Sequence, residues 1–138
     1  MKIGIAGGGP AGLYFALLMK KLKAAHEIRL LEQNSANATY GWGVVFSDRA
    51  VSFLENSAPD FHHDIKSNLE IWDKLVILHK GQPVAIDGSV FSGISRIQLL
   101  HILHEHCRRH GVELQFETRL TDPAIFSDCD LIVGADGV

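Results

Sequence analysis

The stretch Lys2–Ala16, KIGIAGGGPAGLYFA, constrains the fold more than any other part of the chain. A short apolar run meets Gly7, Gly9 and Gly12, which fit the pattern G-x-G-x-x-G, and apolar residues at helical spacing follow. The first glycine allows a sharp turn out of a strand, and the second lets a phosphate approach the backbone. The third lets the new helix pack closely on the sheet. The stretch therefore predicts a strand–turn–helix corner that binds a pyrophosphate.

An acidic residue at the end of the second strand supports this interpretation. The segment Glu27–Glu32 is predicted to be that strand, and Glu32 follows Gly12 by 32 − 12 = 20 positions. A carboxylate at this spacing accepts hydrogen bonds from ribose hydroxyls in dinucleotide-binding folds. The alternative is an ordinary glycine-rich turn followed by a surface glutamate.

Hydrophobic periodicity and turn residues predict the remaining elements. The predicted helices span residues 10–23, 48–55, 59–70 and 96–110, a loop covers 33–46, and the predicted strands span 2–6, 27–32, 74–79, 83–86, 113–117 and 130–133. Alternating strands and helices favour an α/β, Rossmann-like fold with a parallel sheet. The pair 74–79 and 83–86 predicts an antiparallel β addition, because Gly81 and Gln82 between them form a turn.

Composition limits the classes of partner. The chain has 138 residues, which suits one domain, and a net charge of −3 without a basic face, so we expect no nucleic-acid partner. No signal peptide or membrane span is predicted, and two cysteines without ligand spacing favour a reducing compartment, so a cytoplasmic location is expected. Histidine pairs at 101/104 and 106/110 could meet a metal, but nothing completes a ligand set and no metal is assigned.

The last residues, Asp130–Val138, form a predicted strand that enters a turn. A complete domain rarely finishes at such a point. We therefore expect a fragment of a longer polypeptide, with a fold that is incomplete at its C-terminus.

Several motifs carry a family resemblance. Gly7–Leu13 with Glu32 resembles the FAD fingerprint of the single-component FAD-dependent aromatic hydroxylases, and Asp130–Gly137 resembles their second signature. The runs Gly41–Asp48 and Phe91–Arg96 are similar to the branch that acts on aromatic acyl-CoA thioesters, the salicylyl-CoA hydroxylases and 2-aminobenzoyl-CoA monooxygenases. The hydroxylases of the violacein pathway share the Gly-Trp-Gly run.

The resemblance implies that residues 1–138 are the N-terminal part of an FAD-binding domain, within a monooxygenase that hydroxylates an aromatic substrate using NAD(P)H and O₂. An aromatic acyl-CoA thioester is a candidate substrate. Catalytic residues and the oligomeric state are not assigned. The implied cofactor-binding residues are Gly7, Gly9, Pro10, Ala11, Gly12, Glu32, Gln33, Arg96, Asp136 and Gly137.

Three alternatives remain open from the sequence. The chain could be a truncated, non-catalytic dinucleotide-binding module, a flavoenzyme with a different reaction, or a nicotinamide dehydrogenase domain, because an acidic residue contacts ribose in NAD and FAD sites alike. A smaller ambiguity concerns Trp42, which is either a core residue or a contact of the flavin ring.

Overall fold

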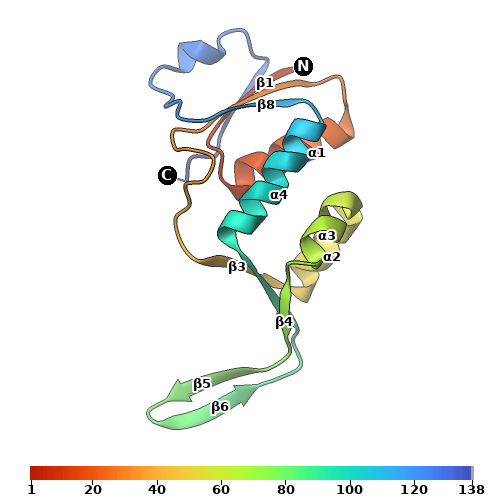
Figure 1. Cartoon of the computed structure of the whole chain (residues 1–138), viewed down its shortest axis with the longest axis vertical. Coiled ribbons are helices and arrows are strands. Elements are labelled where there is room, and N and C mark those ends of the chain that lie inside the picture. Colours follow the sequence, from red (N-terminus) through yellow and green to blue (C-terminus); the bar gives the residue numbers. More distant parts are fainter. Residues whose placement is uncertain (138) are drawn as a thin grey trace. The chain divides into compact units, whose positions relative to one another are not determined.

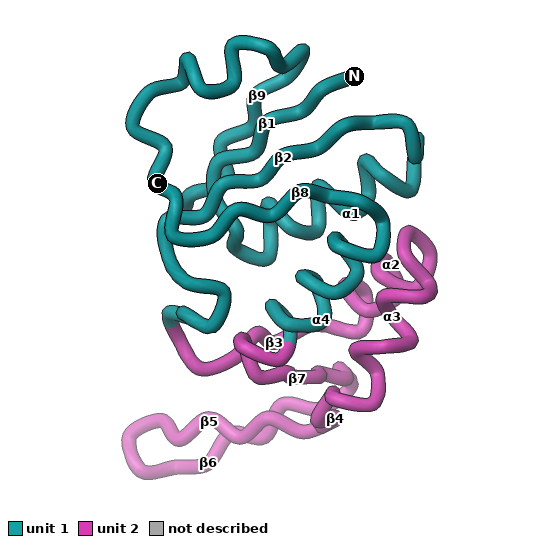
Figure 2. Tube along the Cα trace, turned by 45° about the horizontal axis from the view of Figure 1, so that its top comes forward, with its two compact units in different colours: residues 1–40, 99–138 teal, residues 41–98 magenta. Residues whose placement is uncertain are grey.

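The computed structural model describes residues 1–137 and divides into two compact units (Figure 2). Unit 1 comprises residues 1–40 together with the stretch from Leu99 onward, and unit 2 comprises residues 41–98. Helix α4, Arg96–Arg109, begins in unit 2 and continues into unit 1.

Unit 1 contains a four-stranded sheet in which neighbouring strands are all parallel (Figure 1). The strand order is β8-β2-β1-β9. Its elements are β1 (Lys2–Ala6), α1 (Pro10–Leu22), β2 (Glu27–Leu31), β8 (Val112–Gln115) and β9 (Leu131–Gly134). The predicted α/β fold with a parallel sheet is confirmed. Since β2 and β9 lie on opposite sides of β1, the order reverses there, which is where ligands bind in open α/β sheets.

The core of unit 1 follows from the alternation of strand β1. Ile3 and Ile5 are 1% and 0% exposed, and α1, which contacts β1, buries Leu13 and Leu17. Gly4 points to the other face of the sheet, since side chains alternate along a strand. A Cβ at Gly4 would collide with the ring of Phe126, so this glycine allows the buried ring to lie directly on the strand.

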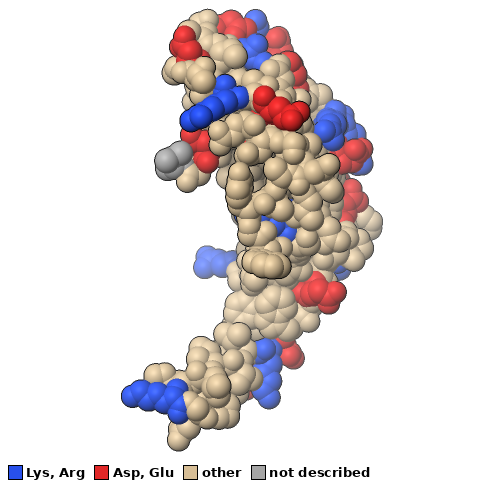
Figure 3. Space-filling model, turned by 60° about the vertical axis from the view of Figure 1, so that its left-hand side comes forward, with Lys and Arg blue, Asp and Glu red and all other residues tan. Residues whose placement is uncertain are grey.

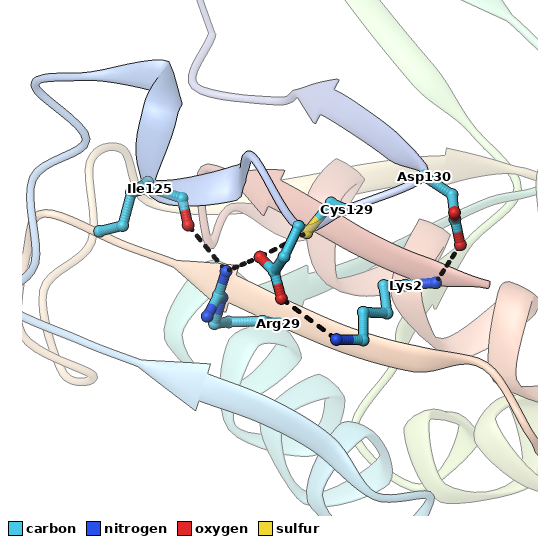
Figure 4. A network of polar contacts seen from close by, with 6 residues as sticks. Lys2, Arg29, Ile125, Cys129 and Asp130 are labelled. Atoms are coloured by element: carbon cyan, nitrogen blue, oxygen red, sulfur yellow. Dashed lines mark hydrogen bonds and ion pairs between the residues drawn. The ribbon is translucent and has the colours of Figure 1, made fainter.

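Phe126 belongs to a short 3₁₀ helix, η1 (Pro123–Phe126), which the sequence did not predict. Polar contacts fix the segment that follows it to the sheet (Figure 4). Arg29 on β2 donates to the Ile125 carbonyl at 2.8 Å and to Asp128 at 3.1 Å, and the backbone N–H of Lys2 donates to the Asp130 carboxylate at 2.7 Å. These contacts set the approach of the chain into β9.

Unit 2 is built on a three-stranded antiparallel sheet of order β3-β7-β4. Its strands are β3 (Gly43–Ser47), β7 (Phe91–Ser95) and β4 (Glu70–Trp72), and its helices are α2 (Asp48–Ser57) and α3 (Pro59–Lys66). The Ser47 hydroxyl caps α2 by accepting from the Ala50 amide at 3.3 Å, and Pro59 occupies the first turn of α3, where a missing N–H costs little.

Two sequence predictions were wrong in unit 2, and one strand was missed. The predicted loop 33–46 already contains the start of β3, the predicted helix 59–70 ends at Lys66 before β4, and 91–95 was not predicted as a strand. Gly41 and Gly43 favoured a loop at the start of β3, as Gly93 did in β7. In the sheet, Gly93 instead accommodates the Trp72 ring, whose atoms lie 3.2 Å from the position of an added Cβ.

The predicted antiparallel pair is confirmed as the hairpin β5 (Leu75–His79) and β6 (Gln82–Ile86). Every residue of both strands is exposed, although most of them are apolar, as with Leu78 at 72%. Along residues 1–137, no helix combines the length and the apolar character needed to cross a membrane.

Candidate coenzyme site

The turn between β1 and α1 is crowded on the side that faces the sheet. Gly7 has φ +111°, and its N–H donates to the Leu31 carbonyl at 2.8 Å. A Cβ on Gly7 would collide with the Ala135 carbonyl oxygen, and one on Gly12 would collide with the Gly7 carbonyl. Both glycines are therefore required by the fold of the corner, with or without a ligand.

Gly9 differs from its two neighbours in the fingerprint. It is the N-cap of α1 with φ −72° and ψ 175°, an extended conformation open to any residue, and no atom lies within 4 Å of the position of an added Cβ. Nothing within the described fold therefore demands a glycine there. The open space beside Gly9 is what a phosphate approaching the backbone would need.

The first turn of α1 supplies donors beside this space. Pro10 has no N–H, while the amides of Ala11 and Gly12 lie too early in the helix to have an intrahelical acceptor. The helix dipole adds partial positive charge at the same end, and no acidic residue occupies the first turn. This end of α1 suits a diphosphate group.

Glu32 lies against the same corner. One carboxylate oxygen, Oε2, accepts from the Gly8 amide at 2.7 Å. The other, Oε1, accepts from the backbone N–H of Asn34 at 2.8 Å and from its side-chain Nδ2 at 2.7 Å. The fingerprint and the acidic residue that the sequence linked by spacing are thus joined by a hydrogen bond.

The segment after β9 closes the corner from the other side. The Ala135 N–H donates to the Ala6 carbonyl at 2.7 Å, and the Asp136 nitrogen lies 2.7 Å from where a Cβ on Gly7 would be. Asp136 is exposed, and Gly137 has φ +86°. The Asp-Gly turn therefore lies beside the glycine fingerprint, at the carboxyl ends of β1 and β9.

Two predicted residues lie elsewhere. Gln33 is exposed directly after Glu32. Arg96 is the first residue of α4 in unit 2, where its backbone N–H donates to the Trp42 carbonyl at 3.2 Å. The remaining predicted residues all gather at the corner of unit 1. The sequence did not predict a role at this corner for Gly8 or Asn34. The only signals were that Gly8 follows Gly7 and that Asn34 lies two residues after Glu32.

Unit 2 has an open groove of about 640 Å³ along β3 and β7. Its lining includes Val44, Asn68, Gly93 and Trp42, which is 98% exposed. Trp42 is therefore no core residue of unit 2. Its predicted role at a flavin ring stays a prediction.

The histidines on α4 have neighbours other than metal ligands. His101 pairs with Asn37 at 3.1 Å, and His104 meets the Phe116 ring edge-on at 4.9 Å between centroids. Burial, with Arg108 and His101 nearby, lowers the pKa of His104 to about 4, although Glu32 acts in the opposite direction. Within residues 1–137, no three His, Cys, Asp or Glu side chains are grouped to hold a metal ion.

Charged side chains of both signs are interspersed on the face drawn in Figure 3. The two cysteines are free thiols, Cys107 buried and Cys129 half-buried. Burial raises the pKa of Cys107 to about 12, and its Sγ lies 3.3 Å from the Leu13 carbonyl. Neither thiol belongs to the corner around Gly9.

The amino-acid sequence of this chain is similar to those of known monooxygenases. A salicyloyl-CoA 5-hydroxylase from a Streptomyces species is 33% identical over 99% of the chain, and a protodeoxyviolaceinate monooxygenase from Chromobacterium violaceum is 31% identical over all of it. The chain spans 26% and 38% of these two relatives. No protein-family model matches the chain.

Solved structures show the same fold. A tetrameric 2-methyl-3-hydroxypyridine-5-carboxylic acid oxygenase superposes with a TM-score of 0.75 and 21% identity, over 88% of this chain and 33% of the other. The resemblance expected from the motifs is confirmed: over nearly its whole length, the chain is related to the FAD-dependent aromatic monooxygenases.

Proposed function

We propose that this chain, as a relative of the FAD-dependent aromatic monooxygenases, binds the ADP half of FAD at the corner between β1 and α1. The single observation that carries the proposal is the contact of Glu32 with the Gly8 amide at 2.7 Å. It brings a ribose-binding carboxylate to a phosphate-binding turn, the pairing that an adenosine diphosphate requires.

Each part of the corner has a separate role in this proposal. The amides of Ala11 and Gly12 and the dipole of α1 stabilise the phosphate charge. Gly9 leaves room for the phosphate to reach those amides. Glu32 accepts hydrogen bonds from the ribose hydroxyls, and Asp136 and Gly137 border the diphosphate from the β9 side.

FAD, when bound, supplies the redox chemistry by which NAD(P)H and O₂ hydroxylate an aromatic ring. The residues of this chain bind and orient the coenzyme. We assign none of them to proton transfer, and we propose Gln33 and Arg96 as further cofactor contacts on the resemblance alone. The enzyme as a whole is proposed to act on an aromatic substrate.

An aromatic acyl-CoA thioester is our proposed substrate class. It is supported by the name of the salicyloyl-CoA 5-hydroxylase relative and by the runs around Trp42 and Gly93. The name of the protodeoxyviolaceinate monooxygenase points to a different aromatic substrate. The rate of flavin reduction with each compound added would separate the two classes.

Titration of the chain with FAD, ADP and NAD tests the binding proposal. We expect saturable binding of FAD and ADP with one site per chain, measured by calorimetry and, for FAD, by flavin fluorescence. Glu32→Gln should weaken ADP binding, since a neutral amide is a poorer acceptor for ribose hydroxyls. Tighter binding of NAD than of FAD would instead support a nicotinamide dehydrogenase domain, and binding of none would contradict the proposal.

A further inference from the structure

Glu32 is held in place by its neighbour Asn34 more than by any part of the glycine fingerprint. Asn34 donates two hydrogen bonds to Oε1, from its backbone N–H at 2.8 Å and from Nδ2 at 2.7 Å, whereas Gly8 donates one to Oε2. An ionised carboxylate has about four acceptor positions. Both acceptor positions of Oε1 are therefore used, and Oε2 is the oxygen that retains capacity for a ligand.

The backbone of this segment is also fixed. The Glu32 N–H donates to Gln115 at 2.8 Å, Thr118 donates to the Glu32 carbonyl at 2.9 Å, and Glu117 donates to the Asn34 carbonyl at 3.0 Å. This pairing continues the β2–β8 ladder beyond both strands. Asn34 therefore has a defined backbone from which its side chain reaches the carboxylate.

Tyr40 sets the orientation of the Asn34 amide. Its hydroxyl donates to Oδ1 of Asn34 at 3.3 Å. A hydroxyl donor at Oδ1 leaves Nδ2, the donor end of the amide, facing Glu32. Tyr40, Asn34, Glu32 and the Gly8 amide thus form a line of hydrogen bonds that ends at the corner of β1 and α1.

We propose that Asn34, oriented by Tyr40, is a positioning residue that presents the Oε2 oxygen of Glu32 to the ribose hydroxyls of the coenzyme. This inference rests on the proposed function, because it needs an adenosine ligand at the corner. It adds a residue that acts through Glu32 and that neither the fingerprint nor its spacing identifies.

The test measures discrimination between two probes, ADP and 2′,3′-dideoxy-ADP, which differ only in the ribose hydroxyls. Hydrogen bonds to a charged acceptor should make the unmodified chain prefer ADP by about tenfold or more. Asn34→Asp keeps the size of the side chain and its backbone N–H but replaces the Nδ2 donor by a second carboxylate. We expect this variant to lose most of the preference for ADP.

Asn37→Asp is the matched control, since it adds the same charge to the same loop at a residue that contacts His101 and not Glu32. It should keep the full preference. Tyr40→Phe removes only the hydroxyl of an exposed side chain and should reduce the preference by about twofold to fivefold. Should Asn34→Asp unfold, as judged by circular dichroism, the Tyr40→Phe result decides.

The outcomes separate the two claims. An unmodified chain that prefers ADP, together with variants at Asn34 and Tyr40 that do so equally well, would overturn the positioning role and leave the proposed function standing. An unmodified chain that binds neither probe, or both alike, would overturn ribose recognition by Glu32 and the positioning role with it.

Discussion

The core of unit 1 and the hairpin of unit 2 use apolar residues in opposite ways. Around the parallel sheet, apolar side chains such as Leu103 on α4 are 1% exposed. Along β5 and β6 every residue is exposed, and Leu78 reaches 72%. Burial of apolar surface stabilises a fold only where that surface leaves water. Within this chain, unit 1 therefore carries its own core, and the hairpin contributes little to stability.

Truncation of one leucine in each region tests this difference most strongly. Leu103→Ala should lower the free energy of unfolding by about 3 kcal/mol, because it leaves a cavity in a packed core. Leu78→Ala, the same change in the hairpin, should alter it by less than about 0.5 kcal/mol. Urea denaturation followed by circular dichroism measures both. If both variants lost the same free energy of unfolding, the hairpin would be buried in solution, which would contradict the difference between the two regions.

A second test compares two glycines of unit 1: one where an added Cβ would collide with other atoms, and one where the space beside it is empty. Gly12→Ala should destabilise by about 2 kcal/mol, because the new methyl group collides with the Gly7 carbonyl and lies 3.2 Å from the Ala135 Cβ. Gly134→Ala has no atom within 4 Å and should change stability little. Similar melting temperatures for the two variants would show that the corner is less tightly packed than described.

The sequence predicts those elements whose structure is determined by residues close together in the chain. The elements β1, α1 and β2 follow from residues close together in the chain: Ile3 and Ile5 alternate, glycines mark the turn, and Pro10 starts the helix. The sheet β3-β7-β4 of unit 2 depends on pairing between distant residues. Gly43 and Gly93 favour a loop when considered locally, and only the partner strands and the Trp72 ring give them a place in a sheet.

The candidate site divides in the same way. Glu32 could be predicted because the crossover from the fingerprint to the second strand has a nearly constant length. Asn34 and Tyr40 could not, since their contacts depend on how the chain turns after β2 and on the side-chain orientations that result. Hydrogen bonds between side chains leave no regular spacing in a sequence.

A pH titration of stability tests the burial of His104. His104 has a pKa of about 4 in the folded chain, against about 6.5 when unfolded. Between these values the unfolded chain binds a proton that the folded chain does not. The stabilisation is therefore complete above pH 6.5, and about 2 kcal/mol of it is lost as the pH falls to 4, after allowance for solvent screening.

His104→Leu should remove that part of the pH dependence, and His63→Leu, on the exposed part of α3, should not. Denaturation midpoints measured at pH 7 and pH 4.5 for the three proteins give the comparison. The same slope in all three would show that His104 titrates as an ordinary surface histidine.

The smallest expected effect concerns thiol chemistry. Cys107 is fully buried with a pKa of about 12, whereas Cys129 is half-buried. Because the thiolate is the reactive form, iodoacetamide should modify Cys129 alone in the native chain and both cysteines in denaturant. Mass spectrometry of the labelled protein counts the adducts, and Cys129→Ser should prevent native labelling. Rapid native labelling of Cys107 would contradict a closed core around α4.

Gly9→Ala tests the central claim most directly, because Gly9 is the glycine of the fingerprint that the described fold itself does not need. The account predicts a variant whose melting temperature matches that of the unmodified chain and whose affinity for FAD and ADP is at least tenfold weaker, since the methyl group occupies the path of the phosphate. A variant that binds both ligands as tightly as the unmodified chain would contradict a coenzyme site at the corner between β1 and α1.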